Sequence, residues 1–174
     1  MGEHMSWTFQ QINAIYNARD TDKEILTHGL TPLARSGANA LLAKRQLRKL
    51  IKTHKSGPVL DALVCCMLAR PDNPAAYLDK ELAAEAGEIP ADWSPCSSTL
   101  SELHGLGIDH RVVSESRSMF IQFFSALGIR NSDFSGLFCS WVGSMWNIAQ
   151  AHEATYLRLL RRNGDYEALF SEPA

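Results

Sequence analysis

The sequence lacks the long hydrophobic runs of a membrane protein. No stretch approaches about 18 uninterrupted apolar residues, so we expect neither a transmembrane helix nor a membrane partner. The N-terminus has no basic start followed by an apolar run, which argues against a signal peptide. Cysteine is scarce and has no zinc-type spacing, which favours reduced thiols in a cytoplasmic protein over a disulfide framework. The four cysteines are Cys65, Cys66, Cys96 and Cys139.

Recognisable catalytic motifs are also missing. There is no glycine-rich phosphate-binding loop, no GxSxG turn of a serine hydrolase and no HExxH zinc-binding pair. His104 and His110 would share a metal only if a turn brought them together, and no basic residue is placed to activate Cys96. We therefore predict a protein that is not an enzyme and that has no catalytic residue, no metal and no cofactor. An enzyme would need catalytic groups that converge from distant segments.

Acidic residues are absent from Ile25 to Leu60, although this segment carries seven Lys and Arg residues. Because the net charge of the whole chain is −2, the remainder carries −9. Charge separated in this way can steer an anionic partner to one side of a molecule. The alternative is that these cations meet the acids of Asp72–Asp92 across an internal or oligomeric contact.

Most of these cations fall within the stretch AKRQLRKLIKTHK, residues 43–55. At 100° per residue, four of them share one helix face and two lie at its edge, opposite an apolar side with Leu47 and Leu50. Such a helix would dock by its apolar side and present a row of cations. The six cations are Lys44, Arg45, Arg48, Lys49, Lys52 and Lys55. They predict a regulatory protein that binds nucleic acid through phosphate contacts. The alternative is an adaptor or inhibitor that binds an acidic partner protein through the same face.

The periodicity predicts an all-α fold, or a mostly α fold with a small β wing. We expect residues 1–5 to be a disordered terminus or tag remnant and residues 6–174 to form a single helical domain. Capping and breaking signals indicate helices over 6–18, 21–29 and 38–55. The second of these is capped by Thr21, and the last is ended by Ser56-Gly57-Pro58. Further helices are expected over 59–70, 77–86 and 97–106, the first of them apolar almost all round.

Residues 58–113 have the order of a tri-helical, helix-turn-helix-like core, with 110–124 as a candidate wing. The segment 117–124 also fits helical spacing before Gly128, and we favour a helix there. The expected recognition helix, Ser97–Leu106, contains no Lys or Arg. This favours a protein-binding or dimerising scaffold over a helix that reads bases in the major groove. Bases could still be contacted by Ser97, Ser98 and Thr99.

The C-terminal helical part, 117–170, includes a long aromatic segment from about 132 to 162. It begins at a cap on Ser132 or Ser135 and forms either one long helix or two, with Gly143 as the candidate break. Its apolar residues cover too wide an arc for one buried stripe, so it must be enclosed by its own domain or by a second copy. A homodimer would use Trp141, Met145 and Trp146 for self-association.

Overall fold

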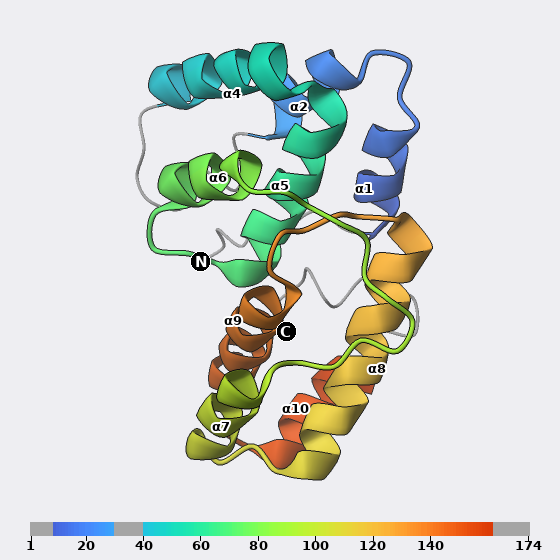
Figure 1. Ribbon diagram of the computed structural model, residues 1–174, viewed down its shortest axis with the longest axis vertical. Helices are drawn as coiled ribbons and strands as arrows, with labels where there is room; N and C mark the ends of the chain where they lie inside the picture. The colour runs from blue at the N-terminus through green and yellow to red at the C-terminus, as the bar shows by residue number, and fades with distance from the viewer. Residues whose placement is uncertain (1–8, 30–39, 162–174) are drawn as a thin grey trace.

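The structure is a computed structural model that describes residues 9–29 and 40–161, and it is built from α-helices (Figure 1). The helices of these ranges are α1 (Phe9–Tyr16), α2 (Thr21–His28), α4 (Ala40–His54), α5 (Ser56–Ala69), α6 (Pro74–Ala83), α7 (Ser97–Gly105), α8 (His110–Leu127), α9 (Phe134–Ile148) and α10 (Glu153–Arg161). Strand-like pairing in the described residues is limited to one isolated antiparallel bridge between Gly87 and Asn131. The all-α prediction is confirmed, while residues 1–5 and 162–170 lie outside the described ranges.

The centre of the molecule is α5, which packs against α1, α2, α4, α6 and α9. Its buried residues run without a gap from Ala62 to Ala69, as a sequence that is apolar on nearly all sides predicts. Figure 1 shows α5 among the upper helices, with α7 to α10 below. One buried hydrophobic cluster joins both groups, from Ile12 in α1 to Leu160 in α10.

The break between α4 and α5 is a single residue. Lys55 has φ 76° and ψ 163°, and its N–H still donates to Ile51 O at 2.9 Å. The chain turns there and enters α5 at Ser56, so Gly57 and Pro58 belong to the first turn of the next helix. Proline is tolerated in a first turn because its missing N–H would have had no intrahelical acceptor. Helix α4 therefore ends where the sequence predicts, but not through Gly57 and Pro58.

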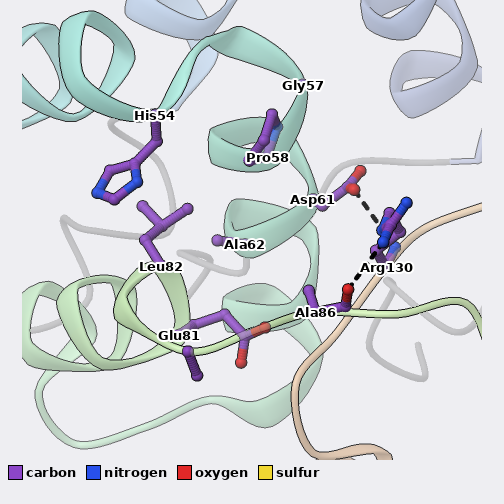
Figure 2. A pocket seen from close by; sticks show the side chains of 10 residues that line it. His54, Gly57, Pro58, Asp61, Ala62, Glu81, Leu82, Ala86 and Arg130 are labelled. Carbon is purple, nitrogen blue, oxygen red and sulfur yellow. Dashed lines mark hydrogen bonds between the residues drawn. The ribbon is translucent and has the colours of Figure 1, made fainter.

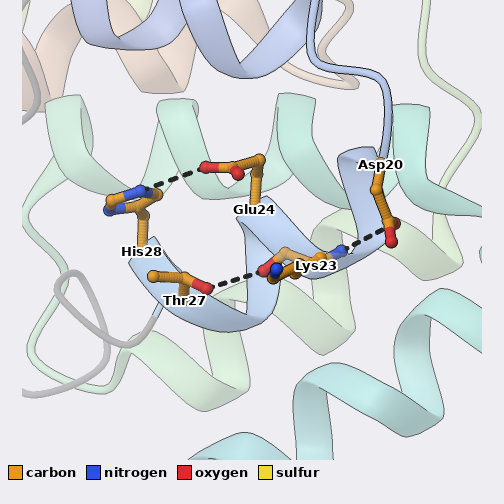
Figure 3. A network of polar contacts seen from close by, with 5 residues as sticks. All are labelled: Asp20, Lys23, Glu24, Thr27 and His28. Atoms are coloured by element: carbon orange, nitrogen blue, oxygen red, sulfur yellow. Dashed lines mark hydrogen bonds and ion pairs between the residues drawn. The ribbon is translucent and has the colours of Figure 1, made fainter.

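The second helix is stabilised by local polar contacts (Figure 3). The Asp20 side chain caps its N-terminus by accepting a hydrogen bond from Lys23 N at 3.1 Å. Thr27 Oγ1 donates to Lys23 O at 2.9 Å, and His28 lies 3.2 Å from Glu24 one turn earlier. The sequence predicted the start of this helix but assigned its cap to Thr21. Asp20 takes that role because its carboxylate reaches the free N–H groups of the first turn.

The helix-turn-helix arrangement expected within 58–113 does not form. Helices α6 and α7 are joined by the extended segment 84–96 and lie well apart, and α7 packs against α9 (Figure 1). Trp93 holds this segment over the aromatic core, with ring centroids 5.3 Å from Phe120 and 5.4 Å from Phe138. Because these contacts draw the segment along the core, the chain cannot fold back tightly after α6.

The β wing is also wrong, and the favoured helix over 117–124 is confirmed. Residues 110–127 form the single helix α8, capped by the Asp109 side chain at Val112 N. Gly128 ends this helix with φ 66°, the left-handed conformation that glycine adopts at low cost. The first predicted wing strand is therefore the beginning of a helix.

The aromatic segment forms two helices, but they separate after Ile148 rather than at Gly143. The Asp133 side chain caps α9 at Gly136 N, a role that the sequence assigned to Ser132 or Ser135. Gln150 and Ala151 both have positive φ, 56° and 58°, and they turn the chain into α10. Gly143 stays helical and lies beside Leu106, the C-cap residue of α7, whose Cδ1 is 3.9 Å from where a Cβ on Gly143 would be.

Candidate functional site

The six predicted cations lie on α4 and at Lys55, the residue that follows it. We call them the basic ridge (Lys44, Arg45, Arg48, Lys49, Lys52 and Lys55). Five of them are exposed and Lys44 is half-buried. On the opposite side of α4, Ala43, Leu47 and Leu50 are buried in the core. The helix docks by its apolar side, as the sequence predicts, and turns the charged side outward.

The basic ridge is not neutralised by carboxylates within the part of the chain that the structure describes. Over residues 9–29 and 40–161, no ion pair joins any of its six side chains to an acid. Asp79 of the neighbouring α6 instead accepts a hydrogen bond from Gln46 at 3.3 Å, and Gln46 also donates to Ala75 O at 3.2 Å. These bonds fix α4 on α6 by a neutral side chain and leave the cations to solvent.

Two large apolar side chains extend the basic ridge at its N-terminal end. Leu41 is 56% exposed and Leu42 is 61% exposed. At 100° per residue, Leu41 falls in line with Arg48 and Lys52. The outer side of α4 therefore combines an apolar end with a cationic body.

A cavity of about 550 Å³ lies below the C-terminal end of α4 (Figure 2). His54 of α4 and Leu82 of α6 lie on one side of it, and Arg130, from the segment between α8 and α9, lies on the other. Arg130 is held there because its Nη2 donates to Ala86 O at 2.9 Å. None of the six residues of the basic ridge lines this cavity.

Two carboxylates border this cavity, and the protein itself supplies hydrogen bonds to both. Asp61 accepts from the Tyr16 hydroxyl and, at 3.3 Å, from Arg130 N. Burial raises the pKa of Asp61, while these two donors act in the opposite direction. Glu81 accepts from Ser132 N at 2.8 Å and from Ser132 Oγ at 2.7 Å. These acids tie α5 and α6 to the segment between α8 and α9, and Asp61 also ties α5 to α1.

The sequence reasoning missed this polar cluster. Asp61 carried a signal, because it is a lone charge in the apolar run of α5 and a buried charge needs partners. Its partners Tyr16 and Arg130 carried none, because they come from segments 45 and 69 positions away.

Cys96 occupies the N-cap position of α7 and is exposed. Its Sγ lies 3.2 Å from Ser98 Oγ and 3.4 Å from Thr99 Oγ1, and its N–H donates to Ser135 Oγ at 3.0 Å. Hydrogen bonds from Ser98 and Thr99 to the thiolate lower the pKa of Cys96 to about 6. The sequence found no base to activate this thiol, and the structure supplies hydroxyl groups instead.

The remaining predicted contact residues do not gather at one place. Ser97 and Ser98 are exposed at the start of α7, whereas Thr99 is buried and donates to Ser135 O at 3.5 Å. Among the described residues, no group of three or more His, Cys, Asp or Glu side chains is arranged to hold a metal ion. No helix in the described ranges has the length and apolar character needed to cross a membrane.

The residues predicted for self-association lie in the chain's own core. Trp141, Met145 and Trp146 are 2%, 4% and 6% exposed. Trp141 stacks on Phe120 of α8, and Trp146 donates to Leu106 O at 3.2 Å. The sequence left open whether this segment is enclosed by its own domain or by a second copy. The chain's own helices enclose it, so these three side chains offer no surface to a second copy.

Comparison of the chain with family models, with curated proteins and with solved structures finds no significant match.

Proposed function

We propose that this protein binds nucleic acid through the basic ridge, as a regulatory protein without catalytic activity. The observation that carries the proposal is that five of the six ridge cations are exposed and that none is paired with an acid in the described residues. Charged side chains that a fold leaves unpaired in a row are suited to an external polyanion. Each phosphate contact would release condensed counterions and so favour binding.

The contacts of such an interface would position the nucleic acid rather than read its bases. The stretch from Lys44 to Lys55 contains no Phe, Tyr or Trp on which a base could stack. The helix also rests on the core by Leu47 and Leu50, which limits its insertion into a groove. We therefore expect weak dependence on base sequence and strong dependence on salt.

The test is charge reversal of the ridge by Arg45→Glu together with Lys49→Glu. Both residues are exposed, so helicity and the thermal midpoint should stay unchanged while duplex binding is lost in a gel-shift titration. For the unaltered protein, four to six phosphate contacts predict a slope of about −4 to −5 for log K against log salt. The matched control is Lys23→Glu with Arg158→Glu, which makes the same change in net charge at exposed sites outside the ridge.

Duplex binding that survives the ridge variant, or that ignores salt, contradicts the proposal. Equal loss in the control variant would also contradict it, because net charge rather than the ridge would then explain the binding.

A second function, binding of an acidic partner protein, is favoured by Leu41 and Leu42. Exposed leucines beside cations suit a protein surface with an apolar pocket and a carboxylate rim better than a phosphate backbone. Leu41→Ser with Leu42→Ser separates the two functions. Under the nucleic-acid proposal this variant binds duplex as tightly as the unaltered protein does. Under the acidic-protein alternative neither the variant nor the unaltered protein binds duplex.

A further inference from the structure

The cavity below the C-terminal end of α4 has the size and lining of a small-molecule site (Figure 2). Its volume is about 550 Å³, and we call it the larger cavity because a second one, between α6 and the beginning of α9, measures about 220 Å³. Small-molecule sites in proteins measure about 300–1,000 Å³ and combine apolar walls with a few polar groups. The larger cavity is lined in this way by Pro58, Ala62, Leu82, Asp61, Glu81 and Arg130.

The guanidinium of Arg130 forms an ion pair with neither carboxylate of the larger cavity. Its Nη2 donates to Ala86 O at 2.9 Å, and no ion pair within the described residues joins it to Asp61 or Glu81. A guanidinium has five N–H donors in a planar fork, which suits two neighbouring acceptors on a flat ligand. Arg130 therefore brings donors to the cavity that the protein's own acids do not use.

The two carboxylates are held in place by neutral donors. Asp61 accepts from the Tyr16 hydroxyl through one oxygen and from Arg130 N through the other. Glu81 accepts from Ser132 N and Ser132 Oγ, again one donor to each oxygen. A carboxylate has about four acceptor positions, so each retains capacity for further donors. Asp61 is the more accessible of the two, and Figure 2 shows it beside Arg130 on one side of the cavity.

This pairing of groups restricts the kind of ligand. A simple anion would be repelled by two carboxylates, and a simple cation would be repelled by the guanidinium. A neutral ligand that carries acceptors next to donors on one edge can use both groups. Guanine has this edge: O6 and N7 are the acceptors that arginine binds in bidentate fashion, and N1–H and the 2-amino group are the adjacent donors. Adenine has an amino donor where guanine has O6.

We propose that the larger cavity binds a guanine nucleoside. Arg130 would donate to O6 and N7, Asp61 would accept from N1–H and the 2-amino group, and the ribose would contact His54 and Leu82 on the opposite side. The volume agrees, because 550 Å³ is room for about 18 water-sized groups at roughly 30 Å³ each, and guanosine has about 20 non-hydrogen atoms. No residue of the basic ridge lines this cavity, so the inference does not rest on the proposed function.

The experiment titrates guanosine into the ¹⁵N-labelled full chain, with adenosine and inosine as matched probes. Guanosine should shift the backbone amide signals of Ala62 and Arg130, and adenosine should not. Inosine lacks only the 2-amino group, so it should bind about tenfold more weakly because one hydrogen bond to a carboxylate is lost. Equal affinity for adenosine would overturn the guanine assignment, and the absence of any shift with guanosine up to its solubility limit would overturn the site.

Two variants connect the binding to the named groups. Arg130→Met removes the guanidinium but keeps the backbone N–H that donates to Asp61, and it should weaken guanosine binding at least tenfold. Should that variant fail to fold, Asp61→Asn is the second test, because its uncharged amide is a poorer acceptor for N1–H and the 2-amino group. Arg158→Met removes the same charge from an exposed site on α10 and should leave the affinity unchanged. Unchanged guanosine affinity in Arg130→Met and in any folded Asp61→Asn protein would contradict the assignment.

The ridge variant, Arg45→Glu with Lys49→Glu, separates this inference from the proposed function. It should bind guanosine as tightly as the unaltered protein does, whereas Arg130→Met should keep its affinity for duplex. Loss of guanosine binding in the ridge variant would place the nucleoside on α4 and overturn the cavity site. Guanosine binding in a protein that binds no duplex would contradict the proposed function alone.

Discussion

Asp61 and Lys52 are charged residues of neighbouring helices with opposite surroundings. Asp61 is drawn into the core side of α5, where Tyr16 and Arg130 donate to it. Lys52 has no ion-pair partner in the described residues and is exposed. Removing a donor of Asp61 would leave a half-buried carboxylate short of partners, whereas removing Lys52 would cost the fold little. At the residue scale, the structural charges and the charges available to a partner are therefore separate sets.

Cys96 allows a pH prediction at this scale. Because hydroxyl groups of Ser98 and Thr99 stabilise its thiolate, its pKa of about 6 lies below that of an ordinary thiol. The rate of alkylation by iodoacetamide should therefore rise with pH around a midpoint of about 6 and be nearly constant above pH 7. Ser98→Ala should move this midpoint upward, toward the value of about 8.5 for an unperturbed cysteine. The measurement is the rate constant at Cys96 by mass spectrometry.

Cys139→Ser serves as the control for this experiment. Burial raises the pKa of Cys139 to about 11, so its removal should leave the reaction near pH 6 unchanged. Cys65 and Cys66 are buried and should not react in the folded protein. A wild-type midpoint near 8.5 would show that the hydroxyl groups do not stabilise the thiolate.

At the scale of the helix, the junction of α4 and α5 stores backbone strain. With φ 76° and ψ 163°, Lys55 adopts a conformation found essentially only for glycine, which costs a residue with a side chain about 1–3 kcal/mol. Lys55→Gly should therefore stabilise the protein, by about 1 kcal/mol after the greater chain entropy of unfolded glycine is subtracted. The measurement is urea unfolding, and a lower midpoint for Lys55→Gly would contradict the prediction.

Lys52→Gly is the matched control for Lys55→Gly, because it removes the same charge from the same ridge. Lys52 is inside α4, where glycine is unfavourable by about 1 kcal/mol, so this variant should destabilise. The two variants should thus change stability in opposite directions. Both should reduce the salt dependence of duplex binding by about one unit of slope.

Helices were predictable from the sequence where local signals define them. Gly128 ends α8, and the apolar side of α4 that contains Leu47 docks as its spacing predicts. The relation between α6 and α7 was not predictable, because it depends on Trp93 reaching Phe120 and Phe138 from distant segments. The order of the helices along the sequence is the same whether the residues between two helices form a tight turn or an extended connection. The basic ridge could be predicted because it lies along one helix, α4. The larger cavity could not be predicted, because its lining comes from three separate segments of the chain.

At the scale of the whole molecule, the core connects two groups of helices that could have been independent. Helix α5 packs on α9, and the buried cluster is continuous from Ile12 to Leu160. The segment 84–96 crosses between the groups and is fastened at Gly87, which exchanges hydrogen bonds with Asn131 at 3.1 and 3.0 Å. Opening either group would expose the shared surface of α5 and α9 to water, which costs about 25 cal/mol per Å² of apolar area.

This continuity predicts that the protein unfolds as one unit. In the described ranges, the tryptophans Trp93, Trp141 and Trp146 all belong to the aromatic core of the lower helices, so their fluorescence reports on that group. Far-UV circular dichroism reports on helices of both groups. In a Trp7→Phe background, which removes the tryptophan outside the described residues, the two signals should give the same urea midpoint and the same slope. Fluorescence that changes at a different urea concentration from circular dichroism would mean that the contact between α5 and α9 is too weak to couple the two groups of helices.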